Sequence, residues 1–471
     1  MGKYRYLIKN VGLMTIGQFG TRFLSFLMVP LYTSVLSTED YGVFDFLVTL
    51  VTLLVPICTV NIYDAVLRFS LDGKQRPSET FAVGMKLFFL GLAVVAGLLL
   101  LNNWINLIPL LNDYAILFLL YYAVYAANLI LSNYARGIDD VPATVVAGVF
   151  STFALLSFNV LFLLVFRWGL FGYFAANILG VLVGCLFYYV KLRLWRLPHW
   201  SCEKKLEREM VRYSTPLILN SVSWWFNSAA CRYIIIGFVG MAANGLFSAA
   251  NKIPSIVSMF ANLFNSAWVM SSVKEFDPLD RDGFFGKMFS GFSFVVLAGS
   301  SVLIVLAYPL GLFLFRDEFL PAWKLVPLLV LAAAFSAISG CIGSLFAAAK
   351  RTSFYSYSTV VGSVTMALLS IALCPILGAM GAVIGTLAGN YAILVVRFLQ
   401  VRRIIKMRIH LLREHLSYVL LMAQCLIILD VSGMPFLYLI EVALFVLLLL
   451  LYSGELRMLI NKVSNRKKKA L

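Results

Sequence analysis

The sequence has little charge, few histidines and no clustered cysteines. Charged residues make up 13% of the 471 residues, where a soluble domain has about 25%. The three histidines and seven cysteines are scattered, without a Cys-x-x-Cys pair or a Cys/His cluster. We therefore expect no metal site, no disulfide framework and no cofactor.

Long polar segments and a nucleotide-binding loop are also absent. The external connections between apolar segments reach about a dozen residues, and the longest cytoplasmic one, 191–209, has about twenty. This leaves no room for a soluble catalytic domain or for the folded basic domain that nucleic-acid binding would need. No Gly-x-x-x-x-Gly-Lys-Ser/Thr motif occurs, which argues against ATP-driven transport by this chain alone.

Hydrophobic residues are abundant instead, at 61% with a mean hydropathy of +0.91. Residues 10–36 and 41–69 are two long apolar segments joined by the polar turn 37–40. Each exceeds the roughly 20 residues that a helix needs to cross a membrane, so we expect a transmembrane hairpin. The first segment lacks a convincing cleavage site and is predicted to remain as an anchor.

Twelve further apolar segments have lengths that suit membrane spans. The sequence therefore predicts an all-α polytopic membrane protein with about 14 transmembrane helices. The further spans are expected at residues 81–101, 114–135, 142–166, 171–190, 213–239, 245–272, 287–312, 325–348, 355–376, 381–400, 416–432 and 435–452.

The basic residues indicate the orientation of these spans. With the N-terminus inside, about 31 of the 38 Lys and Arg residues fall at cytoplasmic ends and loops, and about 3 fall on the far side. The net charge of +16 is then mostly an orientation signal. Both termini are predicted to be cytoplasmic.

Two sequence patterns recur in the second half of the chain. Gly169, Gly172 and Gly180 reappear with the same spacing as Gly378, Gly381 and Gly389, and residues 36–44 resemble residues 239–247. Each copy lies six predicted helices from its partner, and an even number of helices restores the orientation. The duplication therefore predicts two parallel-repeat six-helix bundles around a central cleft.

The predicted domain organisation follows from this duplication. Glycines at 180, 184, 340 and 343 are expected to allow close helix packing. The predicted parts are an N-terminal six-helix bundle (1–192), a cytoplasmic linker (193–209), a C-terminal six-helix bundle (210–402), a basic cytoplasmic loop (403–415), an additional transmembrane helix pair (416–452) and a basic cytoplasmic tail (453–471).

Cations inside the predicted spans are candidates for a binding site, because charged residues there usually face a bundle interior or a wet cavity. They are Arg22, Lys86, Arg232 and Lys252, and the last two are expected to share one site. An excess of unpaired cations favours an anionic ligand, and arginine suits phosphate. For Lys86, snorkelling of the side chain to the cytoplasmic interface is an equal alternative.

Few acidic residues are available to pair with these cations. Asp64 and Arg68 are four residues apart on one helix face and are predicted to pair with each other. Asp45 lies near enough to the outer surface to be solvated. Together with Asn61, these residues are candidates for a structural or ion-coupling role.

A second set of candidates lies near the start of the predicted span 213–239. Its aromatic and amide side chains have the chemistry to stack on and hydrogen-bond to sugar rings, although such aromatics are more often core or interface belt. The set consists of Trp224, Trp225, Asn220 and Asn227.

Several stretches of the chain resemble one known family. Residues 10–19, 29–33, 36–42 and 65–69 resemble the opening of bacterial polysaccharide repeat-unit flippases, and residues 245–253 resemble the eighth helix of the same family. This family belongs to the multidrug/oligosaccharidyl-lipid/polysaccharide exporter superfamily. The resemblance covers roughly residues 6–402.

The resemblance implies a V-shaped pair of six-helix bundles in the bacterial cytoplasmic membrane. It implies an undecaprenyl-pyrophosphate-linked oligosaccharide as substrate, turned from the inner to the outer leaflet, with cations such as those at positions 22, 232 and 252 meeting the pyrophosphate. The partners expected are this lipid-linked oligosaccharide, membrane lipids, H⁺ or Na⁺, and other membrane proteins of polysaccharide assembly, with no nucleic acid.

Two alternative functions can be weighed against this one. A drug or organic-cation antiporter of the same superfamily would need carboxylates in its cleft, where this sequence has an excess of Arg and Lys. A membrane enzyme that modifies polysaccharides would normally show a large outer loop or an intramembrane histidine, and all three histidines fall in predicted cytoplasmic loops. The sequence therefore predicts a transporter and not an enzyme.

Overall fold

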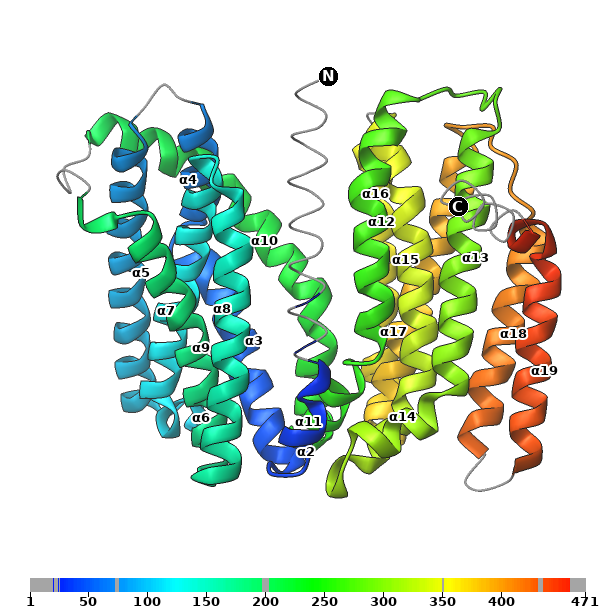
Figure 1. Cartoon of the computed structure of the whole chain (residues 1–471), viewed down its shortest axis with the longest axis horizontal. Helices are drawn as coiled ribbons and strands as arrows, with labels where there is room; N and C mark the ends of the chain where they lie inside the picture. The colour runs from blue at the N-terminus through cyan, green and yellow to red at the C-terminus, as the bar shows by residue number, and fades with distance from the viewer. Residues whose placement is uncertain are drawn as a thin grey trace, which may run out of the picture. The chain divides into compact units, whose positions relative to one another are not determined.

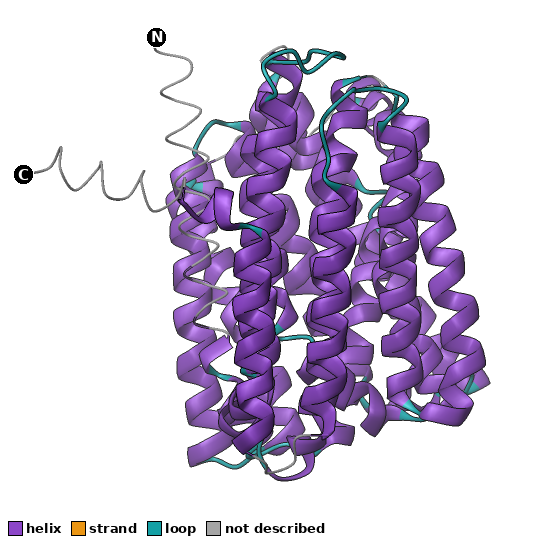
Figure 2. Ribbon diagram, turned by 90° about the vertical axis from the view of Figure 1, so that its right-hand side faces the viewer, coloured by secondary structure: helices purple, strands orange, loops and turns teal. Residues whose placement is uncertain are grey.

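The computed structural model describes residues 20, 24, 26–72, 76–196, 203–349, 351–430 and 435–457. Within these ranges all the regular structure is helical, as Figure 2 shows. Ten of the described helices are long and apolar enough to cross a membrane. The prediction of an all-α polytopic membrane protein is confirmed, whereas the count of 14 spans stays a prediction.

The chain divides into two compact units, residues 1–230 and residues 231–471, and the division falls inside one long helix, α10. Figure 1 labels the helices of each unit. The first unit contains α2 (Val29–Thr33), α3 (Thr38–Cys58), α4 (Ile62–Leu71), α5 (Pro77–Ile105), α6 (Pro109–Asp113), α7 (Ala115–Gly137), α8 (Val141–Asn159), the π-helix η1 (Val160–Val165), α9 (Gly169–Lys191), the 3-10 helix η2 (Leu194–Arg196) and most of α10 (Lys204–Phe238).

The second unit begins in the last two turns of α10. Its appended helices α18 and α19 pack against each other and against α13. The helices of this unit are α11 (Met241–Ala250), α12 (Pro254–Lys274), α13 (Phe284–Val305), α14 (Ala307–Leu314), the 3-10 helix η3 (Asp317–Leu325), α15 (Val326–Ala348), α16 (Thr352–Leu377), α17 (Ala379–Val401), α18 (Leu411–Asp430) and α19 (Pro435–Leu451).

The helix boundaries reproduce the sequence repeats. Helices α9 and α17 begin beside Gly169 and Gly378, which have φ of +56° and +60°. Only glycine adopts this left-handed conformation without steric cost, so each glycine sets the start of its helix. The second repeat aligns the start of α3 at Thr38 with the start of α11 at Met241.

The glycine prediction is also confirmed. A Cβ atom on Gly180 would lie 2.9 Å from Leu155 Cβ, and one on Gly343 would lie 2.7 Å from Tyr355 Cε2. Side chains at Gly184 and Gly340 would likewise crowd Ser151 and Asn265. Because lipid supplies no hydrophobic drive for helices to associate, these close approaches are a main source of packing energy.

Two predicted spans differ from the structure. The segment 41–69 is not one helix, because α3 ends at Cys58 and α4 begins at Ile62. The segment 245–272 is likewise divided into α11 and α12 at residues 251–253. Most of the predicted first span, 10–36, lies outside the described residues. Helix α10 begins at Lys204, within the segment predicted as the cytoplasmic linker.

Candidate polar site around the α3–α4 break

The break between α3 and α4 has a local cause. Pro56 removes a backbone N–H donor from the last turn of α3. Val60 and Asn61 then adopt positive φ values of 56° and 52°. Asparagine tolerates this left-handed conformation better than most residues, and the break turns its side chain into the protein interior.

Asn61 is fully buried and connects three parts of the first unit. Its Nδ2 donates to Asp64 Oδ2 at 2.6 Å, and its Oδ1 accepts from Ser221 Oγ of α10 at 3.1 Å. The predicted pair between Asp64 and Arg68 is therefore wrong, because Arg68 instead bridges to Asp72 at 2.8 Å. The break explains this, since it brings Asn61 to Asp64 at the start of a new helix.

Helix α10 is held against the first unit by polar contacts along one face. Trp225 Nε1 donates to the backbone oxygen of Thr49 in α3 at 2.8 Å. Lys86 Nζ of α5 pairs with Glu207 Oε2 at 2.7 Å, although the Lys86 side chain is 59% exposed. Together with the Ser221–Asn61 bond, these contacts join α10 to α3, α4 and α5.

The sugar-binding candidates of α10 fall on two different faces. Asn220, Trp224 and Asn227 are spaced by four and three residues, which places them on one side of the helix. Asn220 and Trp224 are exposed and Asn227 is half-buried. Trp225 is half-buried on the face that contacts α3, and its indole N–H is used by the hydrogen bond to Thr49.

The predicted cations lie in different places. Arg22 is outside the described residues. Arg232 lies on α10 and Lys252 lies at the α11–α12 break, both half-buried in the second unit, and their shared site stays a prediction. Lys86 has the acidic partner Glu207, which is 121 residues away in sequence and was not predicted. Asp45 is half-buried on α3.

The structure also shows a buried arginine that the sequence analysis missed. Arg397 of α17 is 3% exposed, and its Nη1 donates to the Ser339 backbone oxygen at 2.6 Å and its Nε to Ser358 Oγ at 3.0 Å. Its guanidinium also lies 4.2 Å from the ring centroid of Tyr355. The sequence signal for this residue is its position inside the predicted span 381–400, three residues before the end of that span.

A second missed group joins α18 and α19 to α13. Glu414 is fully buried and accepts from Tyr452 Oη at 2.7 Å and from Ser293 Oγ. Arg413 pairs with Glu455 at 2.7 Å. Glu441 of α19 is also fully buried, and neither of its carboxyl oxygens has a hydrogen-bond partner among the described residues.

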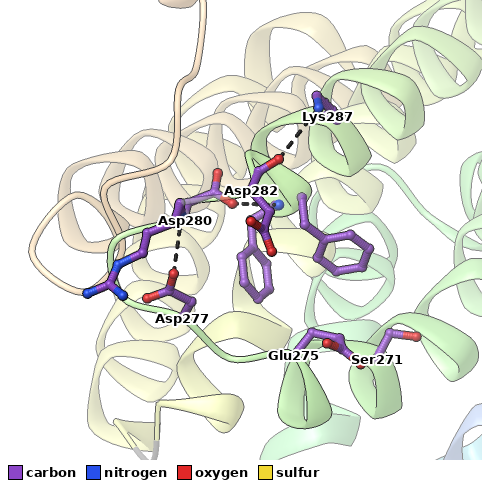
Figure 3. A pocket seen from close by; sticks show the side chains of 9 residues that line it. Ser271, Glu275, Asp277, Asp280, Asp282 and Lys287 are labelled. Carbon is purple, nitrogen blue, oxygen red and sulfur yellow. Dashed lines mark hydrogen bonds between the residues drawn. The ribbon is translucent and has the colours of Figure 1, made fainter.

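An acidic hollow of about 560 Å³ lies at the loop between α12 and α13 (Figure 3). The carboxylate of Asp280 accepts from the backbone N–H groups of Phe285 and Gly286 at the start of α13. The backbone N–H groups of Leu279 and Arg281 lower the pKa of the Asp277 carboxyl. These acids cap the turn and the helix start, so the hollow is a structural feature of the loop.

We compared the chain with protein-family models and with known sequences and structures. Residues 7–270 match the model of a family described as "Polysaccharide biosynthesis protein". No curated protein sequence matches the chain.

Solved structures show the same fold at low sequence identity. A structure described as "Lipid II flippase MurJ, inward closed conformation" is 14% identical with a TM-score of 0.73, covering 95% of this chain and 99% of that chain. An inward-facing multidrug resistance MATE family transporter of the MOP superfamily is 16% identical with a TM-score of 0.64, covering 81% and 94%. An outward-facing MATE family transporter is 18% identical with a TM-score of 0.57, covering 84% and 94%.

Proposed function

The chain belongs to the polysaccharide biosynthesis protein family, and we propose that it is a flippase for undecaprenyl-pyrophosphate-linked oligosaccharide repeat units. It moves them from the inner to the outer leaflet of the bacterial cytoplasmic membrane. The observation that carries this proposal is the combination of the family match over residues 7–270 with a fold similar to that of a lipid II flippase. Ten described helices are long and apolar enough to cross a membrane, as a flippase requires.

The proposed transport follows alternating access. The pyrophosphate contacts Arg22, Arg232, Lys252 and Lys86, and the sugars contact the exposed face of α10 that carries Trp224. The chain divides into two compact units, and in this mechanism they move relative to each other. The polyprenyl tail stays in the lipid while the head group crosses.

The membrane potential is the proposed driving force. A pyrophosphate diester carries about two negative charges, and an inside-negative potential drives them outward, which releases roughly 4.6 kcal/mol per 100 mV. Inward flow of H⁺ or Na⁺ through Asp64 or Asp45 is an additional route for coupling. The direct hydrogen bond from Asn61 to Asp64 supports a role for Asp64 at the α3–α4 break.

An organic-cation antiporter is the second candidate function. The fold shared with MATE family transporters favours it. The candidate residues disfavour it. Lys86 is paired with Glu207, but the other three candidate cations still outnumber the candidate acids Asp64 and Asp45, and Asp64 already accepts a hydrogen bond from Asn61. A cation substrate would be repelled by such a set of residues.

Flipping of a fluorescent lipid-pyrophosphate-oligosaccharide in proteoliposomes tests the proposal. The parent protein is compared with Arg22→Ala and Arg232→Ala at equal insertion, and Arg316→Ala serves as the control because Arg316 is exposed. We expect the parent and the control to flip the lipid and the other two variants to lose most of the activity. An imposed inside-negative potential should accelerate transport.

Two results would oppose this function. If the rate ignores both membrane potential and pH gradient, the proposed driving force is wrong. If the parent moves none of several such lipids but exports an organic cation, the antiporter function replaces the flippase function.

A further inference from the structure

A polar groove lies inside the first unit, between α7, α8 and α9. Its volume is about 460 Å³, within the roughly 300–1,000 Å³ of small-molecule sites. Tyr121, Tyr125 and Asn128 line it from α7, Ser151 from α8 and Tyr188 from α9. These helices are membrane-length and apolar overall, so a row of hydroxyl and amide groups along one interior face calls for a polar occupant.

One arginine lies in this groove without an acidic partner. Arg136, on the last turn of α7, is half-buried, and its Nη2 donates to Asn133 Oδ1 at 2.9 Å. Its Nε donates to the Ser132 backbone oxygen at 3.4 Å. Among the described residues no carboxylate pairs with Arg136, and none lines the groove. The free N–H groups of the guanidinium therefore favour an anion.

In the second unit, the equivalent helices α15, α16 and α17 are connected by an arginine side chain. In the repeat that aligns Gly169 with Gly378, Tyr188 of α9 corresponds to Arg397 of α17. Arg397 reaches across to Ser339 of α15 and Ser358 of α16 and satisfies its own donors there. In the part of the first unit that the structure describes, no hydrogen bond from the Tyr188 side chain joins α7 to α8, and the groove lies between these helices.

The groove walls suit a sugar as well as an anion. The rings of Tyr121 and Tyr125 are stacked with centroids 6.0 Å apart, which presents aromatic surface beside the hydroxyl and amide groups. Because Gly184 has no side chain, Ser151 and Asn128 fit beside it; a Cβ atom at position 184 would overlap Ser151 Oγ. Hydrogen-bonding groups, aromatic surface and a single cation together match a phosphorylated sugar.

We propose that the groove between α7, α8 and α9 binds a phosphorylated sugar, with the phosphate on Arg136 and the sugar hydroxyls on Asn128 and Ser151. This inference rests on the proposed function for the source of the ligand, which is the head group of the lipid-linked oligosaccharide. The groove lies within one unit and uses none of the cations assigned above to the pyrophosphate. It is therefore a separate binding site.

Protection of a cysteine in the groove tests this site directly. Thr144 lines the groove and is half-buried, so Thr144→Cys is made in the full chain after its native cysteines are replaced. The rate of maleimide labelling is measured in detergent with farnesyl-pyrophosphate-linked N-acetylglucosamine or inorganic pyrophosphate as the probe. Thr215→Cys, on an exposed position of α10, serves as the labelling control.

We expect the lipid-linked probe to slow labelling of Thr144→Cys and to leave Thr215→Cys unchanged. Adding Arg136→Gln should raise the probe concentration needed for protection about tenfold or more, because a charge-assisted hydrogen bond is lost. Arg136→Lys should keep part of the protection, and Arg196→Gln, at an exposed arginine, should keep all of it. Protection by inorganic pyrophosphate as well would identify soluble phosphates as a second source of ligand.

The outcomes separate this inference from the proposed function. If neither probe protects Thr144→Cys while the parent flips lipid in vesicles, the groove is not a binding site and the flippase function stands. If the probe protects the groove but no lipid is flipped, the groove binds a phosphorylated sugar and the flippase function is wrong. Protection that survives Arg136→Gln unchanged would overturn the assignment of the phosphate to Arg136.

Discussion

At the scale of single residues, the polar groups near the α3–α4 break connect helices α3, α4 and α10 through a few side-chain hydrogen bonds. Asn61 serves both Asp64 and Ser221, and Trp225 serves Thr49. Each of these bonds is at least partly buried, so water cannot fully take the place of a partner that a substitution removes. Trp224, the neighbouring tryptophan, is exposed, so its substitution is a matched control for that of Trp225.

Trp225→Phe should destabilise the protein by roughly 1 kcal/mol, because it removes the partly buried hydrogen bond from the indole N–H to the Thr49 backbone oxygen, which keeps the Thr52 hydroxyl as a donor. Trp224→Phe should change stability little, since that side chain is 56% exposed. Thermal unfolding in detergent, followed by circular dichroism, measures both variants. Equal losses in the two variants would contradict the role given to the Trp225 N–H.

Asn61→Ala should be more destabilising than Asn61→Gly. Both substitutions lose the buried hydrogen bonds, at about 1–3 kcal/mol. Alanine also pays roughly 1–2 kcal/mol for the left-handed conformation, which glycine adopts freely. Thermal unfolding of both variants checks this order, and an alanine variant at least as stable as the glycine variant would show that the positive φ at position 61 is not required.

At the scale of elements, the duplicated helix pairs pack through glycine. Helices α16 and α17 approach so closely that a Cβ atom on Gly389 would lie 2.7 Å from both the Gly362 backbone oxygen and Met366 Cβ. Gly180, its counterpart in α9, meets Leu155 of α8 in the same way. The repeated glycine pattern is thus a repeated interface.

Gly389→Ala should destabilise the second unit by roughly 1–3 kcal/mol, because the added methyl group forces two helices apart. Gly97→Ala is the control, since nothing lies within 4 Å of a Cβ atom there. Alanine at that position should be neutral or slightly stabilising, through its higher helix propensity. The comparison uses the same unfolding measurement, and a neutral Gly389→Ala would mean that the α16–α17 contact yields without cost.

At the scale of the whole molecule, the distribution of Lys and Arg predicts the orientation in the membrane. The positive-inside rule predicts that the loop between α12 and α13 is cytoplasmic and that the α6–α7 connection lies outside. The proposed transport direction depends on this orientation, because the membrane potential accelerates outward movement of an anion only if the head group starts inside.

Single cysteines test this topology in intact cells after the native cysteines are replaced. Asn112→Cys, in α6, should react with a membrane-impermeant maleimide added outside. Arg281→Cys, at an exposed position of the α12–α13 loop, should react only after the cells are permeabilised. The reverse pattern would invert the predicted orientation and, with it, the proposed direction of transport.

The sequence by itself determined the class, the approximate span positions and the duplication. Apolar segments of more than about 20 residues have few stable structures in a bilayer other than helices, because every backbone polar group must be satisfied internally. The glycine spacing from 169 to 180 and from 378 to 389 already marked equivalent helix starts. These features depend on residues that are close together in the sequence, so the pattern of apolar residues and the glycine spacing are enough to predict them.

Tertiary structure alone decided which polar groups meet. Lys86 and Glu207 are 121 residues apart, and Ser221 and Asn61 are 160 apart, so no local pattern pairs them. At the α3–α4 break, Asp64 accepts from Asn61 and Arg68 pairs with Asp72. In the second repeat Arg397 connects α17 to α15, whereas Tyr188, at the equivalent position of the first repeat, lines the groove beside Arg136. Side-chain partners in a membrane protein depend on which helix faces adjoin, and that is a property of the packed fold.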